Sequence, residues 1–409
     1  MYHINRERLM KQIFDLAKIG EIEGGGCARL ALTDEDKAGR DQVVQWMHAL
    51  GLTVEVDAIG NVIATRAGRL ALPPVMTGSH IDTVRTGGKY DGNLGVLAGL
   101  EVIATLNEQH IETDHPIAVA FFTNEEGARF APDMMGSLVF QGGLPLAEAL
   151  ATVGIDGSTV AENLARIGYA GPRAVGNNQV HAFVELHVEQ GPVLEQEAVT
   201  IGVVTGVQGI HWTEFTITGV SNHAGTTPMH LRHDAGAAAA EVIHFAQGLT
   251  TTLGPDQLAT TGMVQYSPNL INVIPNQVVF TVDLRNVDGP RLHEATQRLF
   301  AFSDTVASKH GVTIQHRNLA DFAPVRFDES VVNLVESMAI AHGQSTRRMP
   351  SGAGHDAQIL AALCPAGMIF VPSVKGLSHN VAELTMPEDI EVGANILLNT
   401  LIALATQKS

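Results

Sequence analysis

The chain has 409 residues, of which 45% are hydrophobic and 17% are charged, and its formal net charge is −18 at pH 7. This composition is typical of a compact globular protein and excludes a disordered chain. The negative charge argues against a nucleic-acid or anionic-membrane surface, because either would repel the protein at long range. We therefore expect neither a nucleic-acid nor a membrane partner, although a local basic pocket could still bind a small anion.

The N-terminal segment places Leu9, Ile13 and Leu16 at helical spacing among charged residues, which predicts an amphipathic helix rather than a signal peptide. No run of roughly 18 apolar residues occurs, so we expect no membrane span. Cys27 and Cys364 are the only cysteines. Two cysteines are too few to cross-link a chain of this length, which favours a reducing, cytoplasmic location.

Residues 33–205 alternate helical patterns with short apolar runs typical of strands, for example at 116–123 and 181–188. This alternation predicts an α/β domain with helices on the faces of a central mixed sheet. The same style resumes after residue 328 and ends in a long helix at about 387–406.

The segment between these parts has a different pattern. Residues 213–326 show the order strand, helix, strand, strand, helix, strand, with a single strand expected at 259–266. This order is the split βαβ, or ferredoxin-like, arrangement of an α+β domain. We therefore predict a catalytic domain made of residues 1–212 and 328–409, with a smaller domain of residues 213–327 inserted into it.

Polar side chains follow the apolar strand runs of the larger domain. In open α/β sheets, ligands bind beyond the carboxyl ends of the strands. Each residue alone has an ordinary structural explanation, as a cap, a turn residue or a solvated charge. The candidates are His80, Asp82, Asp91, Glu125, Glu126, Glu185, His187, Glu189 and His379.

Taken together, these imidazoles and carboxylates suit a pair of cations such as Zn²⁺, Mn²⁺ or Co²⁺. A carboxylate shared between two ions would hold them as a pair, while another carboxylate could take a proton from water. The adjacent Glu125 and Glu126 could divide those roles. The set therefore predicts a dinuclear metal site with a carboxylate placed to accept a proton.

An ordered set of motifs extends from about residue 20 to the C-terminus. As a set, it closely resembles the hydantoinase/carbamoylase family of amidohydrolases, a branch of the dinuclear zinc peptidase and aminoacylase superfamily. Two positions depart from the family pattern, Val381 in place of proline and His233 in place of arginine. The motifs are GSHIDTV…GGKYDGNLG, EEGARF, ELHVEQGPVLE, NHAGTTPM, INVIP, DLR, SGAGHDA and GLSHN.

The resemblance implies two divalent metal ions, with His80, Asp91 and His187 on one and Asp91, Glu126 and His379 on the other. It implies that Glu125 is the general base and that the Asp82 carboxylate orients His80 through its other ring nitrogen.

The resemblance also implies a substrate pocket built from both domains. His223 would stabilise the developing oxyanion, and Arg285 would bind the substrate carboxylate. Asn272, Gln190, Gly354 and His355 are the other implied pocket residues. The sequence GAGHDA is equally compatible with a helix start at Asp356. The family pattern further implies that the inserted domain acts as a moving lid and pairs two subunits into a homodimer.

The main functional hypothesis is metal-dependent hydrolysis of N-carbamoyl-amino acids to amino acid, carbon dioxide and ammonia, with the stereochemistry left open. The stretch at 205–215 favours this reaction, whereas SGAGHDA and GLSHN favour allantoate or a related ureido acid. A dinuclear peptidase or deacylase, and a metal-poor protein that binds ureido acids without turnover, are the remaining alternatives.

Overall fold

The computed structural model describes residues 1–176 and 178–406. The chain forms two compact units, unit 1 (Met1–Gly206 with Arg326–Ser409) and unit 2 (Val207–Val325). The expected boundary after residue 212 would cut strand β7 (Gly209–Thr218), which lies within unit 2. Each unit has its own sheet.

Unit 1 is built on a mixed sheet, which confirms the predicted fold class. Across the described residues this sheet has nine strands in the order β1-β2-β4-β3-β5-β14-β6-β12, with β13 paired to β6. The strands are β1 (Thr53–Val56), β2 (Val62–Arg66), β3 (Val75–His80), β4 (Ile117–Phe122), β5 (Ala182–Val188), β6 (Ile201–Val207), β12 (Val325–Arg326), β13 (Thr346–Ser351) and β14 (Ala366–Val371).

The four central strands, β4, β3, β5 and β14, run parallel to one another. All residues of these four strands are buried, as expected of parallel strands covered on both faces. Their carboxyl ends therefore meet at one edge of the sheet, where α/β proteins place their ligands.

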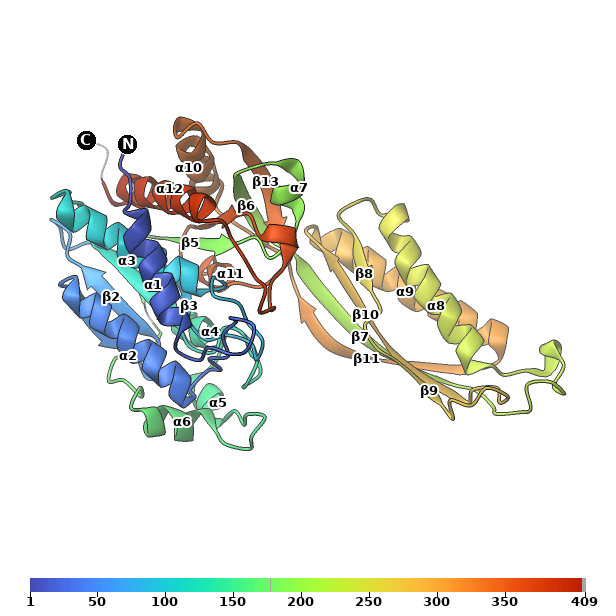
Figure 1. Ribbon diagram of the computed structural model, residues 1–409. Coiled ribbons are helices and arrows are strands. Elements are labelled where there is room, and N and C mark those ends of the chain that lie inside the picture. The colour runs from blue at the N-terminus through green and yellow to red at the C-terminus, as the bar shows by residue number, and fades with distance from the viewer. Residues whose placement is uncertain (177, 407–409) are drawn as a thin grey trace. The chain divides into compact units, whose positions relative to one another are not determined.

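Helices cover both faces of this sheet (Figure 1). On β5, Leu186 lies beneath Gly393 of α12, whereas the neighbouring Glu185 accepts a hydrogen bond from the backbone of Ala357 in α11. Because successive strand residues point to opposite faces, α12 and α11 lie on opposite sides. The unit 1 helices are α1 (Arg6–Ala17), α2 (Asp34–Ala49), α3 (Asn93–Glu108), α4 (Met135–Gln141), α5 (Leu146–Ala151), α6 (Val160–Ile167), α7 (Val193–Glu197), α10 (Glu329–Ala341), α11 (Asp356–Leu360) and α12 (Pro387–Ala405), with a short 3₁₀ turn η2 (Val374–Gly376).

Unit 2 has an antiparallel sheet with α8 and α9 packed on one face (Figure 1). The strand expected at 259–266 is two strands, β8 and β9, that both pair with β10. Thr260 of β8 pairs with Asp283, and Val264 of β9 pairs with Phe280. The segment between β8 and β9 therefore has one more residue than the stretch of β10 that it faces, and the ladder is interrupted there by a bulge. Besides β7, the elements are η1 (Met229–Leu231), α8 (Ala235–Thr252), β8 (Leu258–Thr260), β9 (Val264–Ser267), β10 (Gln277–Asn286), α9 (Gly289–His310) and β11 (Thr313–Phe322).

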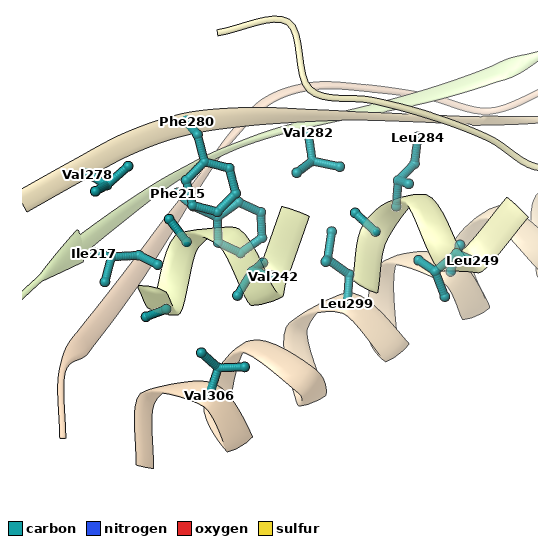
Figure 2. Close-up of a cluster of buried hydrophobic side chains, with 14 of the residues drawn as sticks. Phe215, Ile217, Val242, Leu249, Val278, Phe280, Val282, Leu284, Leu299 and Val306 are labelled. Carbon is teal, nitrogen blue, oxygen red and sulfur yellow. The ribbon is translucent and has the colours of Figure 1, made fainter. Parts of the chain in front are cut away.

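The core of unit 2 lies between this sheet and its two helices (Figure 2). Strand β10 alternates buried and part-exposed residues, so one face carries apolar side chains toward the helices. Phe215 and Phe280 are direct partners across the β7–β10 pair, and their rings stack with centroids 5.1 Å apart. The opposite face of β10 carries Asp283 and Arg285.

None of the helices described here is long and apolar enough to cross a membrane.

Candidate metal centre

The carboxyl ends of the four parallel strands bring the predicted ligands of unit 1 together. His80 is the last residue of β3, Glu125 and Glu126 follow β4, His187 is near the end of β5, and His379 lies in the loop after β14. Asp91 comes from the glycine-rich turn before α3. These side chains line one cavity of about 120 Å³, together with Asp133, Gln190, Ala353, Gly354 and His355.

Asp91 belongs to two groups of side chains that could each hold a metal ion. Within each group, the candidate ligand atoms lie within 4.8 Å of one another. The groups are His80, Asp91 and His187, and Asp91, Glu126 and His379. Asp91 Oδ1 is 3.6 Å from His80 Nε2 and 3.2 Å from His187 Nε2. Its Oδ2 is 3.5 Å from His379 Nε2, which is 3.2 Å from Glu126 Oε2. These groups have the same members as the two ligand sets implied by the resemblance.

Hydrogen bonds fix which nitrogen the two buried histidines present to the cavity. Nδ1 of His80 is 2.8 Å from the backbone oxygen of Asp82, and Nδ1 of His187 is 2.9 Å from that of Val188. A carbonyl can only accept, so Nδ1 carries the proton in each ring and Nε2 faces Asp91. A neutral imidazole held in this way has its Nε2 lone pair available to a cation.

Glycine at position 92 makes this arrangement possible. Its φ is 67°, in the left-handed region, and a Cβ there would lie 2.3 Å from the His80 ring. Any side chain would therefore displace the imidazole. Several non-glycine residues in the loops around the cavity also have positive φ, among them Asn124, Gln190 and His379. Strained backbone of this kind is typical of functional sites, because surrounding contacts must stabilise it.

Asp82 contacts His80 through its backbone oxygen rather than through the carboxylate that the resemblance implied. Its carboxylate Oδ1 is 4.0 Å from His80 Nδ1, and the backbone oxygen makes the closer contact. The carboxylate instead accepts the backbone N–H groups of Glu125 and Glu126, each at 3.3 Å. Burial raises the pKa of Asp82 to about 6. Asp82 thus holds the turn that carries the two glutamates.

Burial and close charges shift the pKa values of these side chains. Burial raises the pKa of Glu125 well above its usual range, although the nearby His80 opposes the shift. Burial opposes charge on His80, but Glu125 and Asp91 outweigh it and raise its pKa well above its usual value. The hydrogen bond that His379 donates to the Glu126 carboxylate raises the pKa of His379 to about 9. Such paired shifts in a cavity are typical of functional sites.

The base of the cavity is formed by a second buried layer. Glu185, which could have faced water, is buried and accepts hydrogen bonds from Ser79 Oγ at 2.6 Å and the backbone N–H of Ala357 at 2.8 Å. His355 is buried, with Nε2 2.8 Å from Ser351 Oγ. Helix α11 begins at Asp356, as the alternative interpretation of GAGHDA predicted. Burial and the adjacent Glu185 raise the pKa of Asp356 to about 8.

The sequence analysis did not single out three contacts of Asp91. Ser378 Oγ donates to its Oδ2 at 2.7 Å, as does Gln190 Nε2 at 2.8 Å. The backbone N–H of Asp91 donates to Glu383 Oε1 at 3.1 Å. Burial and the charge of Asp91 raise the pKa of Glu383 to about 7. Ser378 lies beside the predicted His379 in sequence, whereas no local pattern links Glu383 to Asp91.

The predicted pocket residues His223, Asn272 and Arg285 belong to unit 2. His223 and Asn272 are exposed and lie on paired segments, since Ala224 N donates to Asn272 O at 3.0 Å. His223 Nδ1 accepts the backbone N–H of Gly225 at 3.0 Å, so the ring proton lies on Nε2.

Arg285 donates through Nε and Nη2 to the carboxylate of Asp283, with the shortest contact at 3.0 Å. Its guanidinium also lies 6.0 Å from the centroid of the Trp212 ring. His233, which departs from the family pattern, has Nδ1 2.8 Å from Gly311 O.

Residues 76–403 match the model of Peptidase family M20/M25/M40. The chain belongs to this family. Within it, the chain is 43% identical to an N-carbamoyl-L-amino-acid amidohydrolase of Rhizobium meliloti, over 98% of this chain and 97% of that protein. It is 34% identical to a ureidoglycolate hydrolase of Arabidopsis thaliana, over 97% of this chain and 86% of that protein.

A solved structure shares the same fold. It is an amidase of the hydantoinase/carbamoylase family from Burkholderia multivorans, with a TM-score of 0.97 and 46% identity, and the match covers 100% of this chain and 99% of that chain. The family resemblance inferred from the motifs is therefore confirmed. M20 proteins are metal-dependent, and the two ligand groups at Asp91 are candidate metal sites in this member of the family.

Proposed function

We propose that this protein is a metal-dependent amidohydrolase that cleaves the ureido group of N-carbamoyl-L-amino acids. The products would be the amino acid, carbon dioxide and ammonia. The observation that carries the proposal is the pair of ligand groups sharing Asp91, with Glu125 beside them and outside both groups. The 43% identity to the Rhizobium meliloti carbamoyl-amino-acid enzyme supports this choice of substrate class.

The donor atoms of both groups fit a pair of divalent cations. Nitrogen and carboxylate oxygen ligands suit Zn²⁺, Mn²⁺ or Co²⁺, and we assign His80, Asp91 and His187 to one ion and Asp91, Glu126 and His379 to the other. When bound, such ions acidify water and polarise a carbonyl group.

Glu125 is the proposed general base. Its Oε2 lies 3.3 Å from His80 Nε2, so the carboxylate faces the ligand cluster. Burial raises the pKa of Glu125, which makes its ionised carboxylate a stronger base toward the attacking water and lets the protonated form then deliver that proton to the leaving nitrogen. The carbamate that remains would lose carbon dioxide.

Unit 2 supplies the proposed substrate-binding groups. The proton on His223 Nε2 makes that atom a donor, as stabilisation of an oxyanion requires. Arg285 offers a charged planar donor for the substrate carboxylate, and Asp283 holds two of its nitrogens in place. Asn272 would add an amide contact. These assignments, together with Gln190, Gly354 and His355 from unit 1, define the proposed pocket.

We also propose that unit 2 acts as a lid and pairs two chains into a homodimer. Exposed apolar side chains on this unit support the pairing, including Leu258, Val264 and Tyr266 on β8 and β9. Sedimentation analysis of the full chain tests it. A sedimentation coefficient for a single chain at micromolar concentration would contradict the homodimer.

Ureidoglycolate or allantoate is the second candidate substrate, because the Arabidopsis thaliana relative is named a ureidoglycolate hydrolase. Release of ammonia should be measured from N-carbamoyl-L-amino acids, N-carbamoyl-β-alanine, allantoate and ureidoglycolate, each with Zn²⁺, Mn²⁺ and Co²⁺. The proposal predicts that carbamoyl-L-amino acids give the highest kcat/KM. Preference for another ureido acid would move the assignment to that substrate.

A dipeptide and an acyl amino acid complete the panel. Cleavage of these compounds without ammonia release from any ureido acid would identify a peptidase or deacylase. Binding of ureido acids without any turnover would identify a binding protein.

A further inference from the structure

Two loops distant in sequence supply Asp91 and His379. The turn at 87–92 precedes α3, and the loop at 372–386 lies between β14 and α12. Because Asp91 belongs to both ligand groups and His379 to one, the relative position of these loops sets the spacing of the ligands.

One buried carboxylate joins the two loops. Glu383 Oε1 accepts the backbone N–H of Tyr90 at 2.9 Å and that of Asp91 at 3.1 Å. Glu383 is 5% exposed, and its own backbone N–H donates to Asn380 O at 3.0 Å, one residue from His379. The Glu383 side chain thus holds the backbone amide of Asp91, and the Glu383 backbone belongs to the loop that carries His379.

Close packing leaves this carboxylate little room to move. A Cβ at Gly88 would lie 2.3 Å from Glu383 Cδ, so only glycine fits there. A third segment packs on the same loop, since a Cβ at Gly26 would lie 2.6 Å from Val381 Cγ1. Cys27 and Gly87 exchange backbone hydrogen bonds at 2.9 and 3.1 Å, which ties that segment to the Asp91 turn.

Glu383 does not itself belong to the ligand groups. It does not line the cavity, and it is in none of the candidate metal-ligand groups found among the described residues. Its contacts to the Asp91 turn are to backbone N–H groups, which fix the path of the turn and therefore the direction of the Asp91 carboxylate.

We propose that Glu383 is a positioning residue that holds the Asp91 and His379 loops together and thereby presets the spacing of the metal ligands. This inference rests on the metal centre of the proposed function. Ligand distances in metal sites vary by only about 0.2 Å, so a small shift of either loop weakens both groups. Loss of such supporting contacts typically costs about 10–100-fold in metal affinity.

Two substitutions separate hydrogen bonding from charge. Glu383→Gln keeps an acceptor oxygen at the same distance but removes the charge, whereas Glu383→Asp keeps the charge but withdraws the oxygen. Zn²⁺ and Mn²⁺ affinities of the full chain should be measured by competition with a chromogenic chelator. If Glu383 acts through its hydrogen bonds, the metal affinity of Glu383→Gln should stay within about threefold of wild type. The metal affinity of Glu383→Asp should fall by about 10–100-fold.

Gly88→Ala and Glu101 variants complete the design. Gly88→Ala pushes against the Glu383 carboxylate from the other side and should cause the same loss as Glu383→Asp. Glu101 is also buried and accepts the backbone N–H of Asn5 at 2.8 Å, but it lies outside the cavity. Glu101→Asp should lower the melting temperature in excess chelator without changing metal affinity, as a purely structural carboxylate would.

Three results would overturn the inference. The first is wild-type metal affinity in Glu383→Asp, and the second is a loss of tenfold or more in Glu383→Gln, which would make charge the cause. The third is an equal loss of affinity in Glu101→Asp. Absence of metal binding by the wild-type chain would overturn the proposed centre as well, whereas metal binding without ureido hydrolysis would leave this inference standing and overturn only the activity.

Discussion

The functional side chains of the two units differ in how they are held. In unit 1, His80, Asp91 and His187 are buried, and each makes several polar contacts. In unit 2, His223 and Asn272 are exposed. Burial of several charges is costly unless each is paired. The folded protein therefore supplies the paired contacts of the unit 1 cluster itself, before any ligand binds. Exposed donors instead stay hydrated until a partner replaces the water.

The sharpest test of this comparison removes the proposed base in unit 1. Glu125→Gln should lower kcat by about 10²–10⁴-fold, because the amide cannot take a proton from water. Metal content and melting temperature should stay close to wild type, since Glu125 is in neither ligand group. Turnover within tenfold of wild type would exclude Glu125 as the base.

A core substitution in unit 2 tests whether that unit has an independent core. Phe280→Ala removes a ring stacked on Phe215 and should cost about 3–5 kcal/mol of unfolding free energy. Denaturant unfolding followed by circular dichroism measures the loss. The matched control is Phe322→Ala, since Phe322 is 47% exposed and its removal should change stability by no more than about 0.5 kcal/mol. Equal effects of the two substitutions would contradict the assigned core.

Metal removal should affect unit 1 selectively. A ligand at 100 times its Kd stabilises the folded state by about 2.7 kcal/mol, so chelation should lower the melting temperature and metal should restore it. Amide hydrogen exchange should rise in the turn at 87–92 and the loop at 372–386. The strands of unit 2 serve as the internal control, and exchange that rises equally there would contradict a local metal centre.

A smaller effect is expected at the half-buried Arg285 of unit 2. Arg285→Ala should raise KM for a carboxylate-bearing substrate by about 10–100-fold with little change in kcat, which corresponds to loss of one charge-assisted contact. Arg317→Ala is the control, because Arg317 is also in the unit 2 sheet and is likewise ion-paired, with Glu214 at 3.0 Å, but it is not one of the proposed pocket residues. Unchanged KM in Arg285→Ala would remove it from the pocket.

The same contrast explains how much the sequence could predict. Apolar strand runs that end in polar residues placed His80 and His187 correctly at one edge of the sheet, because parallel strands align their carboxyl ends. The family motifs gave the membership of the two groups at Asp91. For these residues, position along a strand determines position in space.

Other features depend on contacts that leave no local pattern. Periodicity cannot show that the backbone oxygen of Asp82, rather than its carboxylate, contacts His80. Glu383 contacts the amide of Asp91 across 292 positions of sequence. The bulge that divides β8 from β9 depends on pairing with β10, although Gly262 within the expected strand was a signal of an interruption.

The central claim is that the side chains around Asp91 hold a pair of cations. Anomalous X-ray diffraction from crystals of the full chain soaked in Mn²⁺ tests this claim most directly. The account predicts two anomalous peaks in unit 1, one beside His80 and His187 and one beside Glu126 and His379, with Asp91 between them. A single peak, or peaks away from Asp91, would contradict it.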